Sequence, residues 1–171
     1  WEPLGLTITP DRPPPRDTSI PQVRWQPQPI TGMTVTLHNY GDKDLAIVNL
    51  PDAKSFRMVP NTRFVGDHYA WVGVNSTDRP APTATDIIIL KPGAKHSIHL
   101  DLTQPQWWVT DTRKPGSDPM PLQKLTEGWA ASFRIEYAPP TADAVKGLSH
   151  ADLIRHAPLR SRAFNPNQGV D

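Results

Sequence analysis

A two-residue alternation of apolar and polar side chains is the sequence feature that most restricts the fold of this chain. Met33, Val35 and Leu37 alternate with two threonines, and His38 continues the polar series. Successive side chains of a β-strand point to opposite faces, so this period is typical of a strand with one buried face. The segment therefore predicts a sheet that covers a core on one side.

Residues 128–137 repeat the pattern more completely. Their expected inner face carries Trp129, Ala131, Phe133, Ile135 and Tyr137, and their expected outer face carries Ser132, Arg134 and Glu136. Further strands are predicted at residues 4–8, 45–50, 86–90, 98–102 and 159–164. The strand at 86–90 is expected to be buried because residues 87–90 are all apolar. Residues 141–153 allow only short helical turns, since Gly147 disfavours one continuous helix. Together these patterns predict an all-β fold, an antiparallel immunoglobulin-like β-sandwich of about seven to nine strands.

Proline sets the domain organisation. The chain has 21 prolines in 171 residues, and seven of them lie from Pro10 to Pro29. Proline fixes φ and lacks an N–H, so this stretch can be neither a helix nor a central strand. We expect residues 1–29 to form an opening strand and a proline-rich extension laid over the surface, followed by one sandwich domain over residues 30–171.

The charge balance argues against two classes of partner. Eighteen lysines and arginines stand against seventeen aspartates and glutamates, for a formal net charge of +1. Without a basic field, neither nucleic acid nor an anionic membrane surface is an expected partner. No apolar run approaches the roughly 20 residues that a membrane-spanning helix needs.

Cysteine is absent, which removes disulfides and thiolate chemistry. The chain begins with Trp1, which either a removed export signal or a truncated sequence would explain. The low net charge, the many prolines and the missing thiols favour a removed export signal. We therefore expect a periplasmic, extracellular or cell-surface protein. Asn75 opens an N-S-T triplet that would carry a glycan in a eukaryotic secreted protein and would be a polar turn in a bacterial one.

Two histidines three residues apart, His96 and His99, raise the question of a metal or catalytic site. On a helix this spacing brings side chains together, whereas on a strand it puts them on opposite faces. Ile98 and Leu100 define the inner face of the predicted strand, so His96 points inward while His99 and Asp101 point outward. The spacing thus predicts a strand and not a shared metal site.

A second metal hypothesis concerns the outward-facing histidines. Strand pairing could bring His38 and His99, with Asp101, around one copper or zinc ion. Exposed histidines that bind nothing are the alternative. A histidine-based metal-binding sandwich, which could also use His68 or His96, therefore stays open as a function.

Motifs of the common enzyme classes are missing from the sequence. It contains no G-x-S-x-G nucleophile elbow, no H-E-x-x-H helix, no P-loop and no dinucleotide-binding glycine pattern. Carboxylates such as Asp67 and Asp111 lie in predicted loops without a paired acid and base. We expect a protein that is not an enzyme and that uses no cofactor.

Aromatic residues near proline-rich segments are candidate binding residues, because aromatic anchors carry much of the energy of protein interfaces. Adjacent tryptophans on a strand point to opposite faces, so one of Trp107 and Trp108 is expected in the core. The alternative is that loops cover these rings. The candidates are Trp25, His68, Tyr69, Trp71, Trp107 and Trp108.

The order of turns and strands resembles a known class of domain. An N-Y-G-D turn, L-K-P-G before the S-I-H-L-D-L strand, and G-W-x-x-x-F-R-I-E-Y resemble bacterial immunoglobulin-like or fibronectin-III-like β-sandwich domains. The order is similar to that of the non-catalytic N-terminal β-domain of deuterolysin-like metalloproteases, and residues 154–161 resemble its closing strand. The likeness covers residues 33–164 and lacks the zinc helix of those proteases. It implies a non-catalytic, exported interaction module.

Besides the metal-binding sandwich, two functions are consistent with these patterns. The first is an interaction or structural module that contacts another protein in a periplasmic or cell-surface assembly, by strand addition at a sheet edge as one route. The alternative is a protease inhibitor that presents the proline-stiffened loops at residues 77–85 and 111–121.

Overall fold

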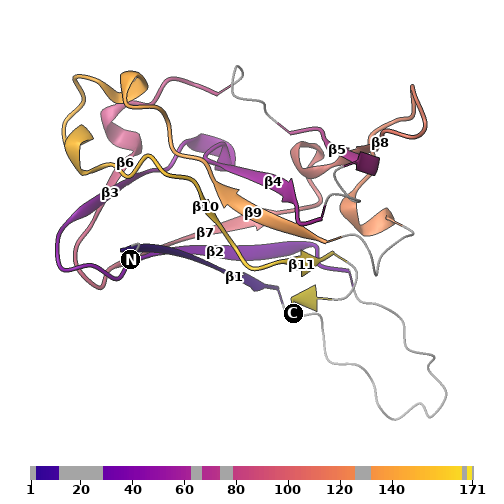
Figure 1. Cartoon of the computed structure of the whole chain (residues 1–171), viewed down its shortest axis with the longest axis horizontal. Helices are drawn as coiled ribbons and strands as arrows, with labels where there is room; N and C mark the ends of the chain where they lie inside the picture. Colours follow the sequence, from indigo (N-terminus) through magenta and orange to yellow (C-terminus); the bar gives the residue numbers. More distant parts are fainter. Residues whose placement is uncertain are drawn as a thin grey trace, which may run out of the picture.

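The computed structural model describes residues 3–11, 29–62, 67–73, 79–125, 132–166 and 169–170. One sheet has three antiparallel strands in the order β1-β2-β7 (Figure 1). These are β1 (Leu4–Pro10), β2 (Gly32–Asn39) and β7 (Lys95–Asp101). The alternation predicted from the sequence is confirmed in the central strand, where Met33, Val35 and Leu37 are fully buried.

A second antiparallel sheet has five strands and is built around β9 (Phe133–Tyr137). β4 (Phe56–Pro60) pairs with β9 along its whole length. On the other side, β9 pairs with β10 (Leu159–Arg160) and β11 (Phe164–Asn165), and β12 (Gly169–Val170) pairs with β11. The closing strand predicted at residues 159–164 is therefore two short strands.

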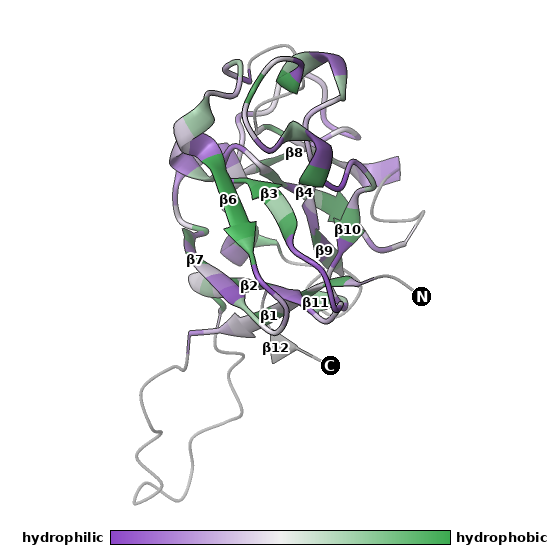
Figure 2. Cartoon of the chain, turned by 90° about the vertical axis from the view of Figure 1, so that its left-hand side faces the viewer, coloured by the Kyte–Doolittle hydropathy of each residue, from purple (hydrophilic) through white to green (hydrophobic). Residues whose placement is uncertain are grey.

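Two ribbons complete the strands of the described chain. β3 (Leu45–Val48) pairs with β6 (Ile87–Leu90), and β5 (Tyr69–Trp71) pairs with β8 (Val109–Asp111). The strand at residues 86–90 was expected to be buried, but among the described residues β6 pairs only with β3, and Ile89 is 38% exposed. Figure 2 shows β6 as a strongly hydrophobic ribbon on this side of the molecule.

Helical structure in the described residues is limited to short turns. The predicted turns at residues 141–153 are η6 (Asp143–Val145) and η7 (Ala151–Leu153). Gly147 lies between them with a φ of 85°, in the left-handed region that glycine adopts without strain. No helix in the part of the chain that the structure describes has the length and apolarity to cross a membrane.

The two larger sheets contribute to one hydrophobic core. The inner residues of β2 and the side chains of Phe133, Ile135 and Tyr137 belong to the same buried cluster. Burying a large apolar side chain contributes about 1.5–3 kcal/mol. The prediction of an all-β protein made of antiparallel sheets is thus confirmed, and its cause is the apolar inner face of each sheet.

Some predicted features lie outside the described residues. They are most of the proline-rich extension with Trp25, the first part of the strand at 128–137 with Trp129 and Ala131, the acceptor residue Asn75, and residues 77–78.

Candidate functional site

β7 forms one margin of the three-stranded sheet, and within the described residues it pairs with β2 alone (Figure 2). Its register with β2 places Leu100 opposite Met33. The Leu102 N–H donates to the Thr31 carbonyl at 2.9 Å, which continues the ladder beyond the strand. Alternate residues of an antiparallel strand bond to the same neighbour, so the even-numbered residues of β7 bond to β2.

The odd-numbered residues of β7 direct their backbone N–H and C=O groups to the other side. These residues are Lys95, Ser97, His99 and Asp101. In the described parts of the chain, no backbone group pairs with Ser97 or His99 on that side. Such a row of free backbone groups is a template for another strand.

A groove of about 470 Å³ lies beside the C-terminal half of this edge. β7 contributes residues 98–101 to its lining. The rest comes from η1 (Pro51–Ala53) with Lys54, and from Gln104 with η4 (Pro105–Trp107). The groove is therefore formed between an open strand edge and two proline-initiated turns.

The turns that line the groove are fixed by local geometry. Pro51 and Pro105 occupy the first positions of their turns, where the fixed φ of proline fits and its missing N–H costs nothing. Asp52 and Ala53 both have a φ of 56°, a left-handed conformation that residues with side chains adopt at a cost of about 1–2 kcal/mol. Gln106 Nε2 donates to the Asp52 carbonyl at 3.3 Å and connects the two turns.

Two of the predicted aromatic residues meet next to the groove. Trp107 is fully buried, and its ring centroid lies 6.2 Å from that of Trp71. Both rings line a small hollow that shares Ala53, Lys54 and Gln106 with the groove. The tryptophans thus support the site from the core side and are not exposed anchors.

Trp108 has a different role from its neighbour. Its indole Nε1 donates to the Thr103 carbonyl at 3.0 Å, and its side chain is partly buried. The expectation that one tryptophan of the pair is buried is confirmed for Trp107. The cause is the helical turn η4, however, and not the alternation of a strand.

The exposed face of β7 is charged. His99 Nε2 lies 2.9 Å from Asp11 Oδ2. The carboxylate of Asp101 accepts bonds from the Thr103 hydroxyl at 2.6 Å, the Thr103 N–H at 3.0 Å and Gln104 Nε2 at 3.1 Å. These bonds, the Thr103 hydroxyl first, lower the pKa of Asp101, which is therefore negative at neutral pH.

The structure does not bring His38 and His99 together. His99 lies opposite Thr34 and His38 lies opposite Lys95, four residues further along β2. At about 3.3 Å per residue, this separates the two positions by about 13 Å, too far for one ion. Asp101 is also opposite a different residue of β2. Among the described residues, no group of three histidines, cysteines or acids could hold a metal.

His96 faces inward, as the alternation predicts. It lies opposite the buried Leu37, and its Nε2 is 3.4 Å from Asn49 Nδ2. Desolvation lowers the pKa of His96, which is partly buried. His68, another candidate, precedes β5 and is partly buried. It is not one of the residues that line the groove.

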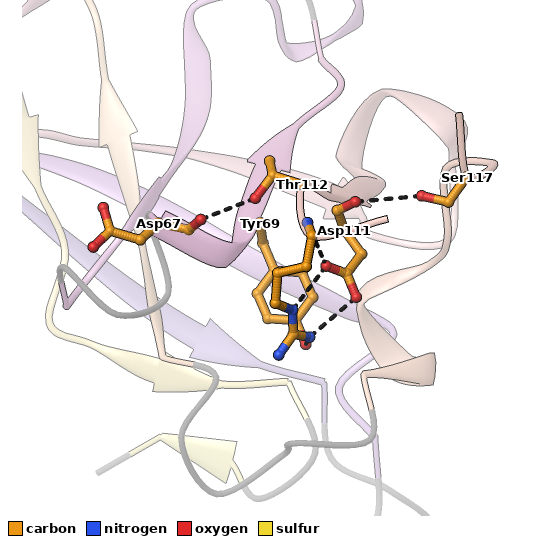
Figure 3. A network of polar contacts seen from close by, with 6 residues as sticks. Asp67, Tyr69, Asp111, Thr112 and Ser117 are labelled. Carbon is orange, nitrogen blue, oxygen red and sulfur yellow. Dashed lines mark hydrogen bonds and ion pairs between the residues drawn. The ribbon is translucent and has the colours of Figure 1, made fainter. Parts of the chain in front are cut away.

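Tyr69 belongs to a network of polar contacts at the β5–β8 ribbon (Figure 3). The buried Asp111 accepts bonds from the Arg113 N–H at 3.0 Å and from Arg113 Nε at 2.9 Å, and these bonds lower its pKa. Arg113 Nη2 donates to Tyr69 Oη at 3.2 Å, and its guanidinium lies over the Tyr69 ring. Ser117 Oγ donates to the Asp111 carbonyl at 3.4 Å. Tyr69 therefore anchors the loop at residues 111–121.

One charged cluster departs from the sequence prediction. Glu136 was expected on the outer face of its strand, but it is 1% exposed. Arg57 of β4 and Arg160 of β10 flank it in register and donate to its two carboxylate oxygens. Arg79 covers the same region and donates to the Ala138 carbonyl at 2.7 Å. No alternation within one strand reveals this cluster, because its members come from four segments.

In comparisons with known proteins, no family model, no curated protein and no solved structure matches the chain.

Proposed function

We propose that this protein is a non-catalytic interaction module that binds an extended segment of a protein along the free edge of β7. The observation that carries the proposal is that the backbone groups of Ser97 and His99 point away from β2, toward the free edge beside an open groove. Strand addition satisfies such groups, and pockets for alternate side chains supply selectivity. An immunoglobulin-like form and an exported location are parts of the same proposal, supported by the sequence patterns and the resemblance.

The opposite margin of the sheet is less suited to strand addition. The Asp11 N–H donates to the Gly32 carbonyl, so the even-numbered residues of β1 face the free side. Pro10 is one of them and has no N–H to offer. β7 has no proline, and its charged ends at Lys95 and Asp101 restrict partners to those of complementary charge.

The test is a proline that removes one outward-facing donor. Ser97→Pro deletes an N–H on the free edge and leaves the even-numbered bonds to β2 in place, a position where edge strands tolerate proline. Peptides selected from a random displayed library on the wild-type protein are then titrated by calorimetry. We expect Ser97→Pro to weaken their binding by about tenfold or more, the value of one lost hydrogen bond.

Ser97→Thr is the matched control, because it alters the same side chain and keeps the N–H. Thermal unfolding followed by circular dichroism checks that both variants fold. Selected peptides that bind Ser97→Pro as tightly as Ser97→Thr would refute strand addition at β7.

A further inference from the structure

The free edge of β7 is complementary to itself. Lys95 and Asp101 are the first and last residues of the strand, and Ile98 is its midpoint. In an antiparallel pairing of two β7 strands centred on Ile98, Lys95 of each copy lies opposite Asp101 of the other. Ser97 likewise lies opposite His99. The residues whose backbone N–H and C=O groups point away from β2 are all odd-numbered. Each of these pairs therefore exchanges backbone hydrogen bonds.

Neighbouring registers lack this match. A shift that centres the pairing on Ser97 places Lys95 opposite His99. A shift that centres it on His99 places Lys95 opposite Thr103. Opposite charges that face each other across strands stabilise a pairing by about 0.2–1 kcal/mol each, and like charges disfavour it. The Ile98-centred register is thus the one that the charges of β7 select.

From this match, and on the basis of the proposed function, we infer that the segment bound by β7 is the β7 strand of a second copy of this chain. The two copies are related by a twofold axis through Ile98, and their three-stranded sheets join into one continuous sheet. Such an interface is isologous, because the same surface patch serves both copies.

The groove fits this arrangement. It lies beside residues 98–101, the half of β7 that would face residues 95–98 of the second copy. The groove is lined by two acids, Asp52 and Asp101, and by one base, Lys54. In the proposed register, the Lys95 that arrives from the second copy lies opposite Asp101. On the inner face, the partly buried Ile98 of each copy meets its counterpart. In this arrangement the β7 strand of each copy lies beside the groove of the other.

Charge reversal tests both the partner and the register. Lys95→Asp and Asp101→Lys each create like-charge pairs at both ends of their own dimer, so each variant alone is expected to be monomeric. Mixing the two variants restores an opposite-charge pair at each end, in a heterodimer. Sedimentation velocity from about 1 µM to about 1 mM covers the range expected for a small interface.

The expected results are a wild-type dimer that weakens with salt, two monomeric variants and a heterodimer on mixing. A wild-type protein that stays monomeric at about 1 mM, or a dimer that neither reversal weakens, overturns the inference. In that case, peptide binding that is sensitive to Ser97→Pro leaves the proposed function standing with another partner. If the wild-type protein stays monomeric and peptide binding is also insensitive to Ser97→Pro, both proposals are refuted.

Discussion

Replacement of the buried Glu136 by glutamine isolates the charge at the centre of the five-stranded sheet. Arg57 Nε donates to Oε1 of Glu136 at 2.5 Å and Arg160 Nε donates to Oε2 at 2.6 Å. Glutamine keeps the size and one acceptor oxygen, but it turns its amide group toward the other guanidinium. The arginines then repel one another without a carboxylate between them.

The expected loss follows from the geometry. A hydrogen bond to a charged group contributes about 1.5–3 kcal/mol, and Glu136→Gln removes one such bond and weakens the other. The side chains of Arg57 and Arg160 are 42% and 61% exposed, so water recovers part of the loss. We therefore expect the free energy of unfolding to fall by about 2 kcal/mol, which lowers the melting temperature by about 4–8 °C for a chain of this size.

Urea unfolding followed by tryptophan fluorescence measures this loss, and the exposed Asp42→Asn is the control that removes a carboxylate elsewhere. A Glu136→Gln variant within about 0.5 kcal/mol of Asp42→Asn would refute the argument that the buried charge stabilises the sheet.

Two further predictions concern the dependence of stability on pH. Burial raises the pKa of Tyr137 to about 12, against about 10 in the unfolded chain, so the wild type should lose about 2–3 kcal/mol as pH rises from 10 through 12. Tyr137→Phe should be less stable than the wild type at neutral pH, because the Val48 N–H loses its acceptor. Its stability should also fall less as the pH rises above about 10. Urea midpoints that fall equally in both proteins would contradict this. The bonds from Arg113 lower the pKa of Asp111, so its stabilisation is present above about pH 4 and is lost as pH falls through the folded value. Asp111→Asn should therefore have a lower melting temperature than the wild type at pH 7, and this difference should disappear in acid. A difference that is unchanged at pH 2 would contradict the stabilising role of the Asp111 carboxylate.

The part of the fold that the sequence predicted is the part that local periodicity determines. The alternation along β2 and β7 assigns Leu37 to the core, and it turns His96 inward and His99 outward. The structure agrees, because each of these side chains has its direction fixed by its own strand.

Features that depend on contacts between distant segments were not predicted. Glu136 has the local pattern of an exposed residue, and only Arg57 and Arg160 on neighbouring strands cover it. The candidate site shows the same limit. The sequence singled out Trp107, yet the groove also needs the left-handed Asp52 and Ala53, which no short pattern indicates.

Amide hydrogen exchange of β7, resolved by residue in dilute protein, tests the open edge most directly. The account predicts that the amides of Ser97 and His99 exchange at least about 100-fold faster than those of Ile98 and Leu100, which donate to β2. Protection of Ser97 and His99 equal to that of Ile98 and Leu100 in the monomer would show that the edge is already occupied and would contradict the account.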